Sequence, residues 1–248
     1  MEKKIDIHAH ILPGVDDGSE SWEESLAMAR LAYEQGFRCI IATPHHSRRR
    51  GTEGLRELAA QLQRQVEEIL PDMTILLGEE LFYYEGLAAD LRAGKALTLA
   101  SSRYALVEFD VEAPFQSIYQ AVRKLSLARF IPVIAHVERY FCLREQENLG
   151  ELMKCDCRLQ MNYDSLQGSF LLDRDVRWCR RQVEEGRIHF LGTDMHGIHH
   201  RKPDISGSMV WLKKHMKKMD RYLLTFGSAE AIIEAGMGEI GDIHGKLL

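Results

Sequence analysis

Residues 5–10 read Ile5-Asp6-Ile7-His8-Ala9-His10, a short apolar strand that ends on two histidines. Residues 190–196, Phe190-Leu191-Gly192-Thr193-Asp194-Met195-His196, end in a similar way. Side chains i and i+2 of a strand point the same way, so His8 and His10 can bind one cation, as can Asp194 and His196. An isolated His-x-His pair is about equally often a metal-binding pair or a pair of ordinary surface or core histidines. Two such pairs at opposite ends of the chain favour a metal site.

The segments between these two stretches alternate in character. Short β-branched or apolar runs are followed by longer amphipathic segments, the pattern of βα units around a parallel sheet. We expect seven strands, over residues 5–10, 37–43, 73–78, 104–109, 131–136, 158–162 and 188–193. We expect helices over residues 22–35, 55–70, 87–93, 115–127, 145–154, 171–185, 209–218 and 229–235.

Several helix ends carry specific signals. Ser21 followed by Glu24 fits a capping box, in which the serine accepts a backbone N–H and the glutamate reaches back to the start of the helix. Gly36 and Gly186 follow helical segments where a positive φ is needed.

The carboxyl ends of the expected strands share a chemical character. Parallel α/β barrels build their active sites at this end, and six of the seven strands deliver a ligand-type side chain there. Any one of these residues has an ordinary structural explanation, such as an exposed loop acid, but their common position favours a polynuclear metal centre. In chain order the strand ends carry His8 and His10, His45, Glu80, Glu108, His136, Asn162, and Asp194 with His196.

Composition narrows the class of protein. The 248 residues with 45% hydrophobic content allow one sizeable domain, and we expect residues 1–248 to form it. The net charge of −5 argues against a nucleic-acid binder. The N-terminus leads straight into a strand, so we expect no signal peptide, no membrane insertion and a cytoplasmic protein. The five cysteines lack Cys-x-x-Cys spacing and are expected to be reduced and mostly structural.

Two basic clusters stand out against this acidic background. Lys213, Lys214, Lys217 and Lys218 lie on an expected helix and are interpreted as a solvated face. The run 48–50, three arginines directly after His45 and His46, is by default a solvated loop, but its position beside candidate ligands also suits the attraction of an anion.

The ligand types indicate the reaction. Imidazoles with carboxylates suit Mn²⁺, Fe²⁺ or Zn²⁺, and two or three such ions about 3.5–4 Å apart can activate water and bind a phosphoryl group. With four carboxylates and neutral histidines, three divalent ions leave +6 − 4 = +2, or +1 with a hydroxide, which a phosphomonoester dianion balances. Arg139 either donates to the phosphoryl oxygens or simply pairs with Glu138 at a helix start.

Five longer motifs carry a family resemblance. They are 8–18 (HAHILPGVDDG), 42–46 (ATPHH), 78–81 (GEEL), 132–140 (PVIAHVERY) and 193–196 (TDMH). From about residue 5 to residue 200 they resemble the PHP superfamily, and more narrowly the CpsB/CapC-type tyrosine-protein phosphatases of bacterial capsule and exopolysaccharide systems. The resemblance implies an α/β fold, a distorted (β/α)7 TIM-like barrel, and hydrolysis of phosphotyrosine on the tail of a bacterial tyrosine kinase.

The resemblance also implies roles for individual residues. It implies three divalent ions, manganese first, with iron, zinc or magnesium as alternatives, and a metal-bridging hydroxide as the nucleophile. Arg139 would bind the phosphoryl group, and His45 or His196 would assist proton transfer. The first ion would be held by His8, His10, Glu80 and Asp194, the second by Glu80, Glu108 and His136, and the third by Asp17, His45 and His196.

Other functions remain as alternatives. A PHP-type phosphatase for a small phosphoester such as histidinol phosphate is the nearest. A nuclease is disfavoured by the acidic charge, and a non-catalytic barrel would predict a degraded ligand set. Gly227-Ser228 stands where relatives often carry Asn-Pro, which bears on barrel closure more than on chemistry.

Overall fold

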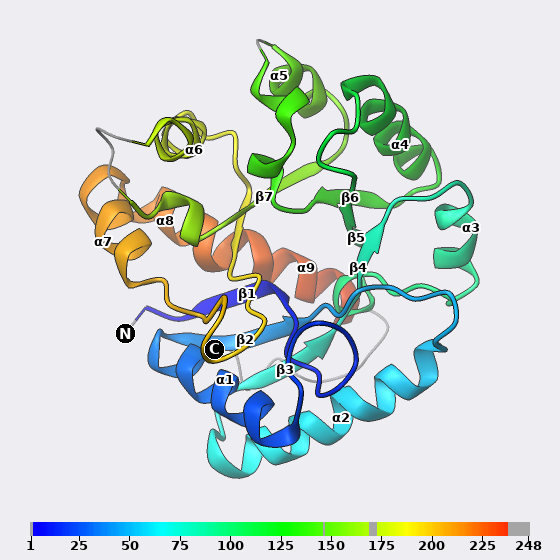
Figure 1. The fold of residues 1–248 in the computed structure, drawn as a ribbon, viewed down its shortest axis with the longest axis vertical. Coiled ribbons are helices and arrows are strands. Elements are labelled where there is room, and N and C mark those ends of the chain that lie inside the picture. Colours follow the sequence, from blue (N-terminus) through cyan, green and yellow to red (C-terminus); the bar gives the residue numbers. More distant parts are fainter. Residues whose placement is uncertain (1, 146, 169–172, 238–248) are drawn as a thin grey trace.

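The computed structural model describes residues 2–145, 147–168 and 173–237. Within them, eight parallel strands alternate with helices (Figure 1). The strands are β1 (Lys4–Ala9), β2 (Phe37–Ala42), β3 (Thr74–Leu77), β4 (Glu80–Phe82), β5 (Tyr104–Glu108), β6 (Ile131–Ile134), β7 (Arg158–Asn162) and β8 (Phe190–Gly192). The helices are α1 (Trp22–Glu34), α2 (Thr52–Ile69), α3 (Leu87–Arg92), α4 (Phe115–Leu127), α5 (Asn148–Met153), α6 (Arg174–Glu184), α7 (Ser206–His215), α8 (Lys218–Tyr222) and α9 (Ser228–Met237), with short 3-10 or π turns η1 (Leu99–Ser101), η2 (Val137–Arg139), η3 (Phe141–Arg144), η4 (Asp164–Leu166) and η5 (Leu223–Gly227).

The strands close into a barrel. One sheet has the order β1-β2-β3 and the other β4-β5-β6-β7-β8. The first and last strands meet at their carboxyl ends, where Asp194 N donates to His8 O at 2.8 Å and His10 N donates to Met195 O at 2.9 Å. This closure brings the two ligand-bearing stretches of the sequence together, and it confirms the predicted TIM-like barrel.

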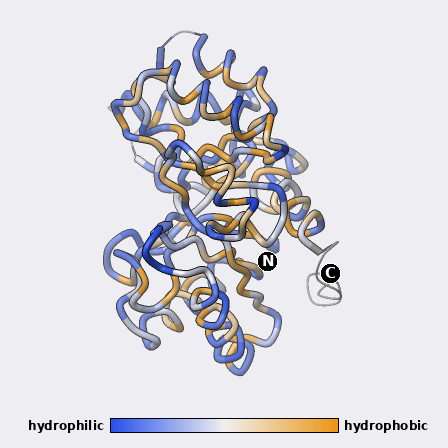
Figure 2. Tube along the Cα trace, turned by 90° about the vertical axis from the view of Figure 1, so that its right-hand side faces the viewer, coloured by the Kyte–Doolittle hydropathy of each residue, from blue (hydrophilic) through white to orange (hydrophobic). Residues whose placement is uncertain are grey.

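Apolar residues form two layers around the strands. One buried cluster joins the strands to the outer helices, such as Ile40 with Met28 and Leu62. The other joins strand residues to η1, η5 and α9, and contains no residue from α1 to α7, which identifies it as the barrel interior. Hydrophilic and hydrophobic residues alternate along the helices (Figure 2), as expected when one side of each helix packs on the strands.

The predicted elements agree with this fold apart from their limits. All seven expected strands form, and the three-residue strand β4 (80–82) was missed because so short a run gives no periodic signal. The expected helix 209–218 corresponds to α7, which ends at His215, and Lys218 begins the separate helix α8; the expected helix 145–154 is reduced to α5. Residues 171 and 172 of the expected helix 171–185 lie outside the described residues, and α6 begins at Arg174.

The predicted helix ends are largely confirmed. Ser21 Oγ accepts from Glu24 N at 3.2 Å, but Glu24 Oε2 accepts from Glu20 N instead of from the serine's own N–H. The glutamate of the predicted capping box therefore accepts from the residue before the serine. Gly36 and Gly186 have φ of 96° and 69°, as the predicted C′ positions require.

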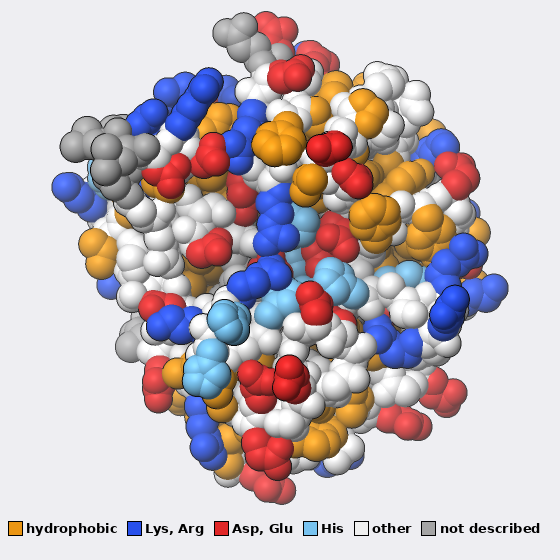
Figure 3. Space-filling view, in the orientation of Figure 1, with side chains coloured by type: hydrophobic (Ala, Val, Ile, Leu, Met, Phe, Trp, Pro, Cys, Tyr) orange, Lys and Arg blue, Asp and Glu red, His pale blue; other side chains and the backbone are white. Residues whose placement is uncertain are grey.

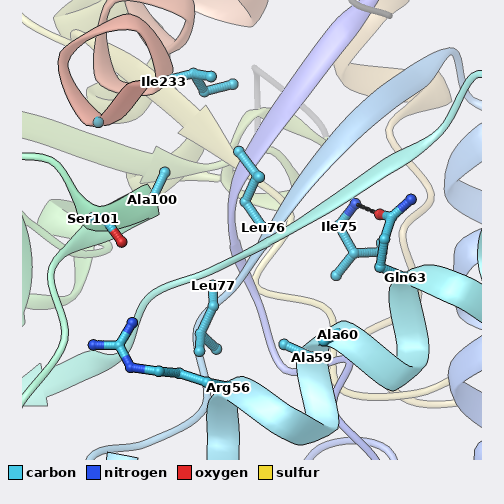
Figure 4. Close-up of a pocket in the computed structure, with 11 residues that line it drawn as sticks. Arg56, Ala59, Ala60, Gln63, Ile75, Leu76, Leu77, Ala100, Ser101 and Ile233 are labelled. Atoms are coloured by element: carbon cyan, nitrogen blue, oxygen red, sulfur yellow. Dashed lines mark hydrogen bonds between the residues drawn. The ribbon is translucent and has the colours of Figure 1, made fainter. Parts of the chain in front are cut away.

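The barrel is interrupted between β3 and β4. These strands follow one another along the chain, but β3 pairs with β2 and β4 with β5, so the outer edge of β3 has no strand neighbour among the described residues. Gln63 Oε1 accepts from Ile75 N on this edge, and α9 packs nearby (Figure 4). A Cβ on Gly236 would lie 2.0 Å from Ala100 O, so α9 could not otherwise come this close. The resulting pocket of about 300 Å³ lies in the barrel wall and contains none of the strand-end residues.

Candidate metal centre

The predicted ligand residues converge at the carboxyl ends of the strands. Figure 3 shows histidine side chains gathered near the middle of this face, with acidic and basic side chains around them. Three groups of ligand atoms lie within 4.8 Å of one another: His8 with His10 and Asp194, His45 with Glu80 and Glu108, and His10 with Asp17, His45 and His196.

The first group is buried deep in the barrel mouth. His8 Nε2 and His10 Nε2 lie 3.4 and 3.5 Å from Asp194 Oδ1. Glu80 Oε2 adds a fourth donor, 3.2 Å from His8 Nε2 and 3.1 Å from His10 Nε2. All four side chains are almost fully buried. Two nitrogens and two oxygens thus face one point.

Glu80 links this group to the second. Its Oε1 lies 2.8 Å from His136 Nε2, and its Oε2 lies 3.2 Å from His45 Nδ1. Glu108 is 3.3 Å from His45 Nδ1 and 3.6 Å from His136 Nε2. Glu80 Oε2 thus faces the histidines of both groups, and Oε1 faces His136, so this carboxylate lies between the two groups.

The third group is the most exposed. Asp17 Oδ1 lies 3.4 Å from His45 Nε2, and Asp17 Oδ2 lies 3.6 Å from His196 Nε2. The Asp17 side chain is 66% exposed, whereas that of His196 is 8% exposed. His45 directs one ring nitrogen to this group and the other to the Glu80 and Glu108 carboxylates. The group therefore lies on the solvent side of the centre.

Strained backbone holds two of these residues. His136 has φ of 31° and Asp194 has φ of 52°, in the left-handed region that few residues other than glycine adopt. Each lies two residues past the end of a strand, in the turn that leaves the barrel mouth. Such strain is found preferentially at functional sites.

A set of buried polar residues fixes the orientation of the histidines. Asp16 Oδ2 lies 2.8 Å from His10 Nδ1, and Gln160 Oε1 lies 3.1 Å from His8 Nδ1 while accepting from His136 N at 2.8 Å. With Nδ1 engaged, each imidazole presents Nε2 to the centre, the arrangement in which metal-ligating histidines are usually held.

Sequence reasoning missed Asp16 and Gln160. Asp16 stands beside Asp17, and no sequence pattern distinguishes which of two adjacent aspartates faces the centre. Gln160 lies two residues before Asn162, on the same face of β7, and its Nε2 donates to Asn162 Oδ1 at 2.9 Å. Asn162 in turn donates to Asp194 Oδ2 at 2.8 Å, so the end of β7 contacts a proposed ligand through a hydrogen bond.

The carboxylates are ionised despite their burial. Burial raises the pKa of Glu80 and Asp194, but the nearby histidines outweigh it and hold both pKa values well below their usual range. The pKa of Glu108 is lowered in the same way, by hydrogen bonds from His136 and His45 that outweigh burial. All three carboxylates thus remain negative at neutral pH.

Protons on the histidines balance this negative charge. Burial lowers the pKa of His136, but Glu108 and Glu80 outweigh burial and raise this pKa to about 9. The pKa of His10 is raised well above its usual range by Asp16, Asp194 and Glu80, again against burial. His196 is the exception, because burial and the charges of His10 and Arg201 lower its pKa to about 4. Cations are the natural replacement for these protons, and the mixed nitrogen and oxygen donors fit borderline divalent ions.

Two arginines reach the same carboxylate. Arg139 Nη2 donates to Asp194 Oδ2 at 2.8 Å, and Arg201 also contacts this oxygen. Arg201 Nη1 lies 3.0 Å from His196 Nε2 as well. Both guanidinium groups are more than a third exposed, so they face the solvent side of the centre. Arg139 is thus bonded to Asp194, and the predicted alternative, a pair with Glu138, does not form.

The cysteines take no part in this centre. All five are free, and burial raises the pKa of Cys157 and Cys179 to about 12. A thiol with so high a pKa is a poor nucleophile at neutral pH.

None of the described helices is both long and apolar enough to cross a membrane.

Comparison with known proteins agrees with this architecture. Tyrosine-protein phosphatase CpsB of Streptococcus agalactiae is 30% identical over 240 residues, covering 93% of this chain and 98% of the relative. Tyrosine-protein phosphatase YwqE of Bacillus subtilis is 35% identical over 226 residues, covering 89% and 88%.

Solved structures give the same result. A chain from the crystal structures of YwqE from Bacillus subtilis and CpsB from Streptococcus pneumoniae, described as unique metal-dependent tyrosine phosphatases, superposes with a TM-score of 0.83 at 33% identity and covers 93% of this chain and 94% of its own. A dihydropyrimidinase from Brevibacillus agri matches at a TM-score of 0.53 and 12% identity, which shows the barrel fold alone.

The family model described as capsular polysaccharide synthesis, CpsB/CapC, matches residues 4–234. That span contains every strand and every predicted ligand. The chain therefore belongs to the CpsB/CapC family.

Proposed function

We propose that this protein is a metal-dependent protein-tyrosine phosphatase that dephosphorylates the tail of a bacterial tyrosine kinase controlling capsule or exopolysaccharide synthesis. The observation that carries the proposal is the convergence of eight ligand-type residues from distant parts of the chain into three overlapping groups, with His136 beside them at 2.8 Å from Glu80. The relatives' names supply the substrate class.

The ligand assignment that we propose overlaps these groups but is not identical to them. His8, His10, Glu80 and Asp194 would hold the first ion, and Glu80 with Glu108 and His136 would hold the second. Asp17, His45 and His196 would hold the third. The ions, manganese in our proposal, would activate a water and neutralise phosphoryl charge when bound. His45 also lies close to the second group, so its Nδ1 is available to that group when its Nε2 serves the third.

The chain's own residues would bind and orient the substrate. Arg139 projects to the exposed side of the centre, where its guanidinium can donate to two phosphoryl oxygens after leaving Asp194. His45 and His196 lie on the exposed side of the centre and are our candidates for assisting proton transfer. Tyrosine leaves as a phenolate with a pKa near 10, so the reaction needs little help from a strong acid.

The proposal includes the setting of the enzyme. We place it in the cytoplasm, as a single barrel domain spanning residues 1–248, and its five free thiols suit a reducing compartment. The substrate is a phosphorylated protein tail, and no nucleic acid is involved.

The test compares metal-stripped protein with and without added Mn²⁺, using phosphate release from a phosphotyrosine peptide. His136→Ala removes a proposed ligand, and His215→Ala on α7, a histidine stacked on Trp211 away from the centre, is the matched control. We expect Mn²⁺ to restore hydrolysis in the parent and in the control but not in His136→Ala. Hydrolysis that is unaffected by metal removal and by His136→Ala would refute the mechanism. Hydrolysis of histidinol phosphate but not of the phosphotyrosine peptide would move the assignment to the small-phosphoester alternative.

A further inference from the structure

A charged pocket lies beside the metal centre. We name it the arginine pocket; it has a volume of about 610 Å³ and lies between the β2–α2 loop and the loop after α3. It is lined by His46, Arg48, Arg49, Arg50, Gly51, Thr52, Glu53, Asp90, Gly94 and Lys95. Figure 3 shows Lys and Arg side chains beside the histidines on this face. None of the proposed metal ligands lines this pocket.

The arginine pocket is attached rigidly to the metal centre. His46 directly follows His45, a proposed ligand. Arg50 Nη1 donates to Val15 O at 2.7 Å, and its Nη2 donates to His45 O. On the far side, Thr52 Oγ1 donates to Gly94 O at 2.9 Å. These bonds join the pocket to the residues that flank the metal centre.

Its charge is opposite to that of the whole chain. Four cationic side chains and two carboxylates line it, a balance of +4 − 2 = +2, whereas the chain carries −5. Among the described residues, Arg48, Arg49 and Lys95 are exposed and make no ion pair. Asp90 already accepts from Tyr84 Oη at 2.8 Å. Unpaired positive charge thus faces the solvent next to the centre.

Two polar groups at the pocket have no partner of their own in the described part of the chain. The 18-residue helix α2 begins there, and its N-cap residue Gly51 supplies no capping side chain, so first-turn N–H groups and the positive end of the helix dipole are available. The His46 side chain is only 5% exposed, yet its Nε2 has no hydrogen-bond partner among the described residues. The helix start favours an anionic ligand, and the buried Nε2 of His46 is left for a polar partner.

Aromatic side chains lie between the pocket and the strand ends. The Arg48 guanidinium lies 4.9 Å from the centroid of Tyr84, whose ring stacks on His46 with centroids 6.0 Å apart. Phe82 is the last residue of β4, the strand that carries Glu80, and is 53% exposed; Tyr83 follows it. A peptide backbone leaving the centre can thus cross an apolar surface before reaching the arginines.

Resting on the proposed function, we propose that the arginine pocket binds a carboxylate or phosphate group on the same peptide, a few residues from the phosphotyrosine being hydrolysed. The preferred substrates are then acidic phosphotyrosine segments. The group comes either from Asp or Glu side chains or from a second phosphotyrosine, and both present the same anionic oxygens to Arg48, Arg49 and Lys95.

The test measures kcat/KM for three peptides that differ only in their flanks: one neutral, one with glutamates, and one with a second phosphotyrosine. We compare the parent with an Arg48→Gln/Arg49→Gln variant, and a Lys213→Gln/Lys214→Gln variant on α7 serves as the control for an equal loss of charge. We expect the parent and the control to prefer an acidic peptide over the neutral one by about tenfold, mainly through KM, as two exposed ion pairs imply. The arginine variant should lose most of this preference, and 0.5 M salt should reduce it in the parent.

The outcomes separate the two proposals. An equal ratio of acidic to neutral peptide in the parent and the arginine variant would overturn the arginine pocket. If the parent hydrolyses neither the phosphotyrosine peptides nor the aryl phosphate p-nitrophenyl phosphate, the proposed function is overturned instead. If only the doubly phosphorylated peptide is preferred, the ligand is a phosphate; if the glutamate peptide is preferred as well, carboxylates suffice. A single Arg49→Gln variant, whose side chain makes no ring contact, should show a smaller loss in the same direction.

Discussion

Asp16 offers the sharpest test of how the centre is held together. It binds no ion in our proposal, but its carboxylate accepts from His10 Nδ1 at 2.8 Å, His45 N at 2.8 Å and Gly18 N at 3.1 Å. It therefore positions two proposed ligands at once. The change Asp16→Asn keeps the size of the side chain and removes the charge, and one of its two oxygens becomes an amide that cannot accept these bonds.

The magnitude follows from the pKa of this group. Burial opposes ionisation, but the bonds from His10, His45 and Gly18 lower the pKa of Asp16 from 3.8 to about 2. At 1.36 kcal/mol for each pKa unit, the ionised form gains about (3.8 − 2) × 1.36 ≈ 2.4 kcal/mol from its surroundings. Losing about 2 kcal/mol of this from the metal-loaded state corresponds to about 30-fold weaker binding, within the range of about 10–100-fold found when such supporting groups are changed.

The assay is a Mn²⁺ titration of the metal-stripped protein, followed by calorimetry and by recovery of phosphotyrosine hydrolysis. We expect Asp16→Asn to need about 30-fold more Mn²⁺ for half activation, with substantial recovery at saturating metal. Asp156→Asn changes an exposed aspartate before β7 and should match the parent. An unchanged Mn²⁺ affinity in Asp16→Asn would refute the reasoning that this carboxylate orients His10 and His45.

Three further outcomes are expected. The pKa of His136 in the metal-free protein is about 9, so this ligand is protonated at pH 7; metal binding should release protons and tighten as the pH rises toward 9, and calorimetric heats that do not vary with the ionisation enthalpy of the buffer would contradict this. A Cβ on Gly18 would lie 2.2 Å from the backbone oxygen of His10, so Gly18→Ala should weaken Mn²⁺ affinity and lower the urea midpoint. Gly54→Ala in α2, with open space around it, should leave the affinity unchanged and raise stability by up to about 1 kcal/mol. Tyr140→Phe removes the buried acceptor of Phe109 N, 3.1 Å away, and should cost about 1–3 kcal/mol in urea unfolding; a midpoint equal to that of the parent would exclude this contribution.

The sequence by itself determined the strands and the chemical types at their ends. The period of two in a strand is a local property, so the pairing of His8 with His10 could be recognised without a fold. The alternation of strand and helix predicted a parallel barrel, and a parallel barrel brings strand ends to one rim. Glu80 was predicted correctly at this rim even though the short strand β4 that carries it was not.

Tertiary structure decided which residues support the ligands. Gln160 contacts His8 across 152 positions of sequence, and Asp16 reaches His45 across 29. Such contacts depend on barrel closure and on the turns at the strand ends, where His136 and Asp194 adopt left-handed backbone conformations. A hydrogen bond between distant residues has no sequence period, so only the folded chain could show that Asp16 orients a ligand while Asp17 faces the cluster itself.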